Sequence, residues 1–313
     1  MAKQFSVLKK KELLVDQTKA STGGDYTPPA EGLARARLIA YVEVGKHEKI
    51  SKQYGTKVQN MVHLTFELSG PKWEPKKLDD GTLIPQRITL KENLSTNTKA
   101  RFYKLFLKLR DGREDITHFA EMLGEACLIR IKHREYEVDA GGKKEKRVAV
   151  DVYSPDSGWS ITPPYILKDI MDENDEPTGE QEKKHVTISD PLSDLRLFIW
   201  DCADKEQWDS LYIEPGDGDR SKNVFQELIV SAKNFIGSPA EAAAHGSESL
   251  EAILKGGKGS GESATDDDAD DDSEGSVEDK SSKKATSAVK KVVKKKVETK
   301  TEDEEADLLA DID

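Results

Sequence analysis

The last part of the chain limits what the whole can fold into, because residues 256–313 contain no aromatic side chain. This stretch consists mainly of Gly, Ser, Thr, Ala, Lys and acidic residues. Such a segment cannot bury enough apolar surface to offset the entropy lost on ordering. We therefore predict a disordered charged tail over residues 241–313, which leaves the folded part to the residues before it.

Charge is sorted along the sequence. Residues 1–160 carry 29 Lys and Arg against 22 Asp and Glu, residues 161–254 carry 8 against 20, and residues 255–313 carry 11 against 18. A basic segment attracts phosphates, whereas acidic segments repel them. The net charge of −12 for the whole chain therefore conceals a basic N-terminal half that is suited to nucleic acid.

Alternating apolar residues predict five short strands, at residues 34–44, 57–68, 87–90, 126–136 and 147–152. Between the third and fourth strands the apolar period becomes that of a helix, with Phe102, Leu105, Phe106 and Leu109 on one side. Five strands with a helical insertion before the fourth match a small Greek-key barrel of the OB type, although other small α+β domains share this pattern. The predicted fold is thus mainly β, with an OB-type five-stranded barrel.

The domain organisation follows from these patterns. We predict a flexible arm over residues 1–30, the OB-type domain over 31–160, a linker over 161–189, a small acidic α/β extension over 190–240, and the tail over 241–313. The extension is expected to contain strands near residues 195–200 and 211–213 and a helix over 221–235. Its acidic composition argues that it does not hold DNA by itself.

Basic and aromatic residues recur on the outward face of three predicted strands. OB-type barrels bind single strands by combining a basic groove with aromatic rings on which bases stack. The loop residue Trp73 is a further stacking candidate or a structural anchor. A solvated basic face is the alternative for any single strand, but three neighbouring strands share the pattern. The predicted DNA-binding residues are Arg35, Arg37, Tyr41, Lys57, His63, Trp73, Arg130, Lys132, Arg134 and Tyr136.

The chain ends in a short segment that combines acidic and apolar residues. Acidic groups keep such a tip off DNA, and the apolar side chains offer a partner pocket something to hold. A purely solubilising tail is the alternative. The predicted partner-binding residues are Asp307, Leu308, Leu309, Asp311, Ile312 and Asp313.

Enzyme signatures are missing from the sequence. It has no Gly-x-Ser-x-Gly or His-Glu-x-x-His motif, and Cys127, Cys202 and the 6 His residues are scattered. We therefore predict a protein that is not an enzyme and has no metal or cofactor. The first residues lack the apolar run of a signal peptide, and no run of 18 apolar residues occurs, so we expect no membrane partner.

Several segments follow one another in a characteristic order: GLARARLIAY at 32–41, Gly45, LTFEL at 64–68, PQRITL at 85–90, LGEACLI at 123–129, residues 197–210 and 221–223, Gln226, and NFIGS at 234–238. In this order they resemble the motifs of the single-stranded DNA-binding proteins of tailed bacteriophages. The resemblance covers roughly residues 32–238, whereas the Lys-rich loop at residues 70–81 and the Lys block at residues 283–296 depart from the family pattern.

This resemblance implies an OB fold, sequence-independent binding of single strands in phage DNA replication or recombination, and an acidic tip that contacts a polymerase, primase or helicase. The implied location is the cytoplasm of the infected bacterial host. Two other functions stay open from the residues. One is an interaction or scaffolding protein whose basic face binds an acidic protein partner, and the other is a strand-annealing recombination mediator.

Overall fold

A computed structural model describes residues 27–51, 55–78, 80–140, 143–174, 176–213, 222–247 and Leu250. Its centre is a sheet of seven strands, ordered β10-β6-β1-β2-β5, in which β7 also pairs with β6 and β13 also pairs with β1. The strands of this sheet are β1 Gly32–Ser51, β2 Gly55–Ser69, β5 Arg87–Asn93, β6 Ala126–Ala140, β7 Lys143–Asp151, β10 Ile161–Thr162 and β13 Arg196–Phe198. The pairings are antiparallel except for β1 with β13, which is parallel.

The predicted mainly β fold is confirmed, and a helix does precede the fourth long strand. This helix is α1 (Arg101–Arg110), which buries Phe102, Leu105 and Leu109 on one side. Among the described residues the end strands β10 and β5 do not pair with each other, so the sheet is open and does not close into a barrel.

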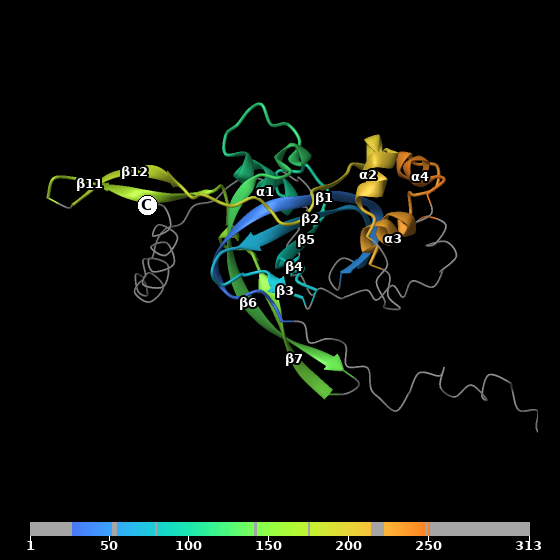
Figure 1. Cartoon of the computed structure of the whole chain (residues 1–313), viewed down its shortest axis with the longest axis horizontal. Helices are drawn as coiled ribbons and strands as arrows, with labels where there is room; N and C mark the ends of the chain where they lie inside the picture. The colour runs from blue at the N-terminus through green and yellow to red at the C-terminus, as the bar shows by residue number, and fades with distance from the viewer. Residues whose placement is uncertain are drawn as a thin grey trace, which may run out of the picture.

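Two long hairpins project from the sheet, and the C-terminal helices gather at one end of β1 and β2 (Figure 1). One hairpin is β6 with β7, and the other pairs β11 with β12. The remaining elements are β3 Lys76–Lys77, β4 Leu83–Ile84, the 3-10 helix η3 Phe119–Met122, β8 Tyr153–Ser154, β9 Gly158–Trp159, β11 Tyr165–Met171, β12 Pro177–His185, the 3-10 helix η4 Trp200–Cys202, α2 Lys205–Ser210, α3 Val224–Ser231 and α4 Pro239–Ala244.

Strand β1 is buried on both of its faces. Ala34, Ala36 and Leu38 belong to a core that α1 and η3 cover, whereas Val42 and Val44 belong to a second core with α2, α3 and α4. A strand that is covered on both sides is normally apolar throughout. The sequence of β1 fits this rule from residue 38 to residue 42, where every side chain is buried.

A bulge in β1 changes which residues face which core. Leu38 pairs with Phe66, but Ala40 pairs with the next residue of β2, Thr65, so Ile39 is an extra residue in β1. One extra residue reverses the alternation of the side chains that follow it, here as far as a second register shift between Glu43 and Gly45. Tyr41 therefore joins Leu38 in the first core, and Ala40 turns to the second.

The C-terminal extension is part of the same folded unit. Strand β13 pairs with β1 at Ala40, Tyr41 and Val42, and the second core includes residues from both. The buried Glu43 carboxylate connects the two sides, because it accepts hydrogen bonds from the Tyr41 hydroxyl and from the backbone N–H of Trp200, each at 2.8 Å. The extension therefore covers a face of the sheet that would otherwise expose apolar side chains.

Three of the predicted segment boundaries need correction. Residues 161–189 are not a plain linker, because they contain β10, β11 and β12. Residues 211–213 lie outside the strands, and the folded part continues past residue 240 into α4, with Ala243, Ala244 and Leu250 in the second core. The strand near residues 195–200 and the helix within 221–235 are present as β13 and α3.

The space around Gly45 shows how closely the C-terminal extension packs on β1. Its φ is +85°, and a Cβ added there would lie 2.4 Å from the Trp200 ring and 2.7 Å from the Ala232 Cβ. Gly55 has a similar φ of +70° but has nothing within 4 Å of its added Cβ. Gly55 therefore reports the backbone strain alone.

We expect Gly45→Ala to lower the free energy of unfolding by roughly 2–5 kcal/mol, because backbone strain and overpacking add. Gly55→Ala should cost only about 1–2 kcal/mol. Urea unfolding of both variants measures the difference. Equal losses would show that Trp200 does not pack against Gly45.

Candidate nucleic-acid interface

The outward residues of β1 do not form an open binding surface. Arg37 donates hydrogen bonds to the backbone carbonyls of Ser189 (2.7 Å), Gly124 (2.8 Å) and Ile188 (2.7 Å), so its guanidinium holds the segment after β12 against the sheet. Arg35 is half-buried. Tyr41 has 0% of its surface exposed, and its ring packs on Phe119. The prediction that Tyr41 stacks on a base is therefore wrong.

Two further stacking or contact candidates are also buried. His63 is only 7% exposed and its ring meets Phe225 of α3 edge-on, with 5.8 Å between ring centroids. Trp73 is 3% exposed and donates a hydrogen bond from its indole nitrogen to the Ala30 carbonyl at 3.2 Å. Trp73 is thus a structural anchor, which was the alternative considered for it. Lys57 is exposed, opposite Lys49 near the end of the β1–β2 hairpin.

A second buried carboxylate explains why the outward face of β2 is covered. Glu67 accepts hydrogen bonds from the backbone N–H groups of Leu192 (2.6 Å) and Ser193 (2.9 Å) and from the Ser193 hydroxyl. A buried carboxylate needs such partners to offset its desolvation. Arg37 and Glu67 together fix residues 188–193 across the face where a DNA groove was expected.

The predicted residues on β6 do share one accessible face. Cys127, Ile129 and Ile131 point into the first core, and the residues between them point away from it. Lys132 and Arg134 are exposed, and Arg130 and Tyr136 are half-buried. Strand β7 adds Arg147, which lies directly opposite Tyr136 and is exposed. We call this set the basic hairpin face: Arg130, Lys132, Arg134, Tyr136 and Arg147.

The opposite face of the same hairpin has its own charges paired. Lys144 lies 3.2 Å from the Glu137 carboxylate, and Lys146 lies 3.7 Å from that of Glu135. These diagonal cross-strand pairs neutralise the lysines of that face. On the basic hairpin face the strand register places two acidic residues, Asp151 opposite Lys132 and Glu145 opposite Val138. The hairpin is therefore basic on one side and nearly neutral on the other.

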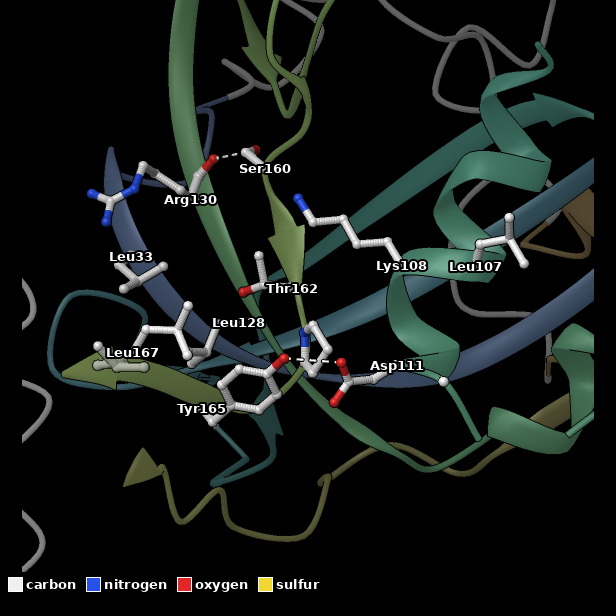
Figure 2. A pocket seen from close by; sticks show the side chains of 13 residues that line it. Leu33, Leu107, Lys108, Asp111, Leu128, Arg130, Ser160, Thr162, Tyr165 and Leu167 are labelled. Carbon is white, nitrogen blue, oxygen red and sulfur yellow. Dashed lines mark hydrogen bonds between the residues drawn. The ribbon is translucent and has the colours of Figure 1, made fainter. Parts of the chain in front are cut away.

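An open groove of about 680 Å³ lies where α1 approaches β6, β10 and β11, and Arg130 forms part of its wall (Figure 2). We call it the α1–β11 groove. Burial lowers the pKa of Lys108, which lines the groove and donates a hydrogen bond to the Trp159 carbonyl. The lining residues are Leu33, Leu107, Lys108, Asp111, Gly112, Leu128, Arg130, Ser160, Thr162, Pro163, Tyr165, Ile166 and Leu167.

The sequence prediction missed Arg147, Lys108 and Tyr165. Arg147 could have been predicted, because it begins the expected strand at residues 147–152, and the structure pairs it with Tyr136. Lys108 and Tyr165 come from a helix and from a segment that was taken for a linker, and only the tertiary fold brings them to one groove. No periodicity in the sequence marks that juxtaposition.

The remaining predicted site lies outside the described residues: Asp307, Leu308, Leu309, Asp311, Ile312 and Asp313. Within the described ranges, no group of three or more His, Cys, Asp or Glu residues is placed to hold a metal ion. In the same ranges, no helix is long and apolar enough to cross a membrane.

The buried His63 makes stability depend on pH. Burial, followed by the charges of Lys91 and His47, lowers its pKa from 6.5 to about 4. The unfolded chain binds a proton near pH 6.5, but the folded chain does so only near pH 4. The contribution of neutral His63 is therefore complete above pH 6.5 and is lost as the pH falls from 6.5 towards 4.

We expect this effect to remove about 2–3 kcal/mol of the free energy of unfolding between pH 7.5 and pH 4.5. His63→Leu should lose that part of the pH dependence, whereas His245→Leu, at an exposed position, should retain it. Urea unfolding at the two pH values measures the three proteins. The same pH dependence in His63→Leu and the parent would contradict the burial of His63.

Comparison with known proteins finds no matching family model, no matching curated protein and no matching solved structure.

Proposed function

We propose that this protein binds single-stranded DNA without sequence preference, and that the basic hairpin face carries the contact. The observation behind the proposal is a row of Arg130, Lys132 and Arg134 along β6 that leads to the half-buried Tyr136, with Arg147 of β7 directly opposite that tyrosine. Cations that follow a backbone, together with an aromatic ring on which a base stacks, are the usual means of holding a single strand. The protein would act by coating DNA in phage replication or recombination and would not be an enzyme.

The strand arrangement supports an OB-type module as the framework of this site. Three antiparallel strands (β1, β2, β5), a helix (α1) and then β6 and β7 run in the order predicted from the sequence, and the short β10 also pairs with β6. OB folds are partly open five-stranded Greek-key barrels that bind oligonucleotides with one sheet face and with the loops after strands 1 and 4. The fourth strand of this order is β6, and its far end pairs with β7 to form the projecting hairpin (Figure 1).

The test is a fluorescence-anisotropy titration of the full chain with labelled oligo-dT and with a duplex of equal length, at two salt concentrations. We expect tighter binding to the single strand, with an affinity that falls with salt at a logarithmic slope of about −0.7 per phosphate neutralised. Equal affinity for both DNA forms would exclude base stacking. Failure of oligo-dT to compete with an acidic protein partner would favour the interaction-protein alternative.

Variants on the two sides of the hairpin serve as matched controls. Tyr136→Ala should weaken oligo-dT binding by about 1–3 kcal/mol with little change in salt slope, whereas Lys132→Ala and Arg134→Ala should each lower the slope by about one contact. Lys144→Ala and Lys146→Ala, which remove the same charge from the opposite face of the hairpin, should bind almost as the parent does. Equal losses on both faces would show that only overall charge matters.

We further propose that the acidic and apolar tip recruits replication proteins. Deleting residues 307–313 should leave oligo-dT affinity nearly unchanged and abolish pull-down of a purified polymerase, primase or helicase of the same replication system. Deleting residues 266–272 is the control, because it removes the same number of residues and more acid but no leucine or isoleucine. If both deletions reduce the pull-down equally, the tip acts only through its charge.

A further inference from the structure

The α1–β11 groove has an aliphatic floor and an aliphatic rim. Leu33 of β1 and Leu128 of β6 line its base, where Leu128 is 1% exposed and packs with Ile166, while Leu107 of α1 and Leu167 of β11 line its edge, 43% and 51% exposed. Large aliphatic side chains that remain exposed around a concave surface indicate a binding site for an apolar group. A volume of about 680 Å³ is within the usual range for small-molecule sites, roughly 300–1,000 Å³.

Polar groups are placed at the two ends of this floor. Figure 2 shows Arg130, Ser160 and Lys108 towards one end and Tyr165 with Asp111 towards the other, with Thr162 and Leu128 between them. The cationic end is suited to a phosphate. The middle and the aromatic end are suited to a flat ring.

The Tyr165 ring is held in place by two neighbours. Its hydroxyl donates a hydrogen bond to Asp111 Oδ1 at 2.9 Å, and the Lys183 ammonium lies 4.3 Å from the ring centroid and 2.9 Å from Asp111 Oδ2. The hydrogen bond from Lys183 and then that from Tyr165 lower the pKa of Asp111. Asp111 itself ends α1 with a φ of 50°, the one positive φ outside glycine among the described residues.

The groove is continuous with the basic hairpin face through one residue. Arg130 belongs to the outward row of β6 that includes Lys132 and Arg134, and it also lines the groove. A single-stranded DNA whose phosphates follow this row of side chains would reach the groove at Arg130. Its next base would then lie over Leu128 and beside Tyr165.

We propose that the α1–β11 groove is a nucleotide subsite that takes one unpaired base of the bound strand. The base packs on the aliphatic floor and against the Tyr165 ring, and Arg130 and Lys108 hold the adjoining phosphate. This proposal rests on the proposed function and names a second contact for the same strand. A base inside a duplex cannot enter the groove without leaving its stack, so the subsite would add to the preference for single strands.

The test fills the groove without removing a charge. Thr162→Trp places an indole over the floor, and Thr187→Trp is its control, because Thr187 is exposed and is not among the lining residues. Both full-length variants are titrated with oligo-dT and with an abasic strand of the same length, which retains every phosphate but has no base.

A second pair of variants covers the case in which Thr162→Trp does not fold. Leu167→Glu puts an acid at the rim of the groove, and Met171→Glu puts the same charge at an exposed position of the same strand that does not line it, with 51% and 53% of the parent side chains exposed. Both positions face solvent, so neither change should unfold the protein.

We expect Thr162→Trp to weaken oligo-dT binding about five- to a hundredfold, the loss that one base contact costs, at an unchanged salt slope. Its affinity for the abasic strand should equal that of the parent. Leu167→Glu should weaken oligo-dT binding more than Met171→Glu does. A titration with dTMP alone measures whether a free nucleotide also occupies the groove. If dTMP binds there but the groove variants bind oligo-dT as their controls do, the groove is not a subsite for the bound DNA.

Two other outcomes would overturn the subsite. In one, Thr162→Trp and Leu167→Glu bind oligo-dT and the abasic oligonucleotide as their controls do. In the other, Thr162→Trp weakens both strands equally, which would place the phosphates and not the base at the groove. These results would leave the proposed function intact, because the parent would still prefer oligo-dT to duplex. A parent that fails to bind oligo-dT would instead remove the proposed function itself.

Discussion

The burial of β1 on both faces is the constraint on which the rest of the structure depends. A strand with apolar side chains on both sides needs two separate covers, and the chain supplies α1 with η3 on one side and β13 with α2 to α4 on the other. Glu43 lies at the centre of this arrangement, because its carboxylate binds the Tyr41 hydroxyl and the Trp200 backbone at once. Losing either partner would leave a buried charge poorly satisfied, which is costly in a low-dielectric interior.

This double cover decides where a nucleic acid can bind. The acidic C-terminal half occupies much of the outer sheet face, and Arg37 and Glu67 fix the segment that crosses it. Basic residues remain accessible where β6 leaves the sheet and pairs with β7 alone. The C-terminal half thus lies against the sheet, and accessible basic residues lie on one face of the projecting hairpin.

The long strands of the central sheet were predictable because their alternation is regular, whereas the two-residue strand β10 was not. The outward row of β6 was predicted correctly. The burial of Tyr41 was not predictable, because the extra residue Ile39 reverses the alternation of the side chains and nothing in the local composition marks a bulge. His63 is covered by Phe225, more than a hundred residues away in sequence. Strand β12 has no apolar alternation, because all but one of its residues are exposed, and its segment was therefore mistaken for a linker.

The parallel pairing of β1 with β13 also has a consequence for synthesis on the ribosome. Glu43 and Trp200, which are hydrogen-bonded in the folded protein, are separated by 157 positions. At a translation rate of about 5–20 residues per second, roughly 8–30 s pass between the emergence of the two. During that interval Ala40, Val42 and Val44 have no cover from their own chain, so the nascent sheet is a natural client for a chaperone until its last strand arrives.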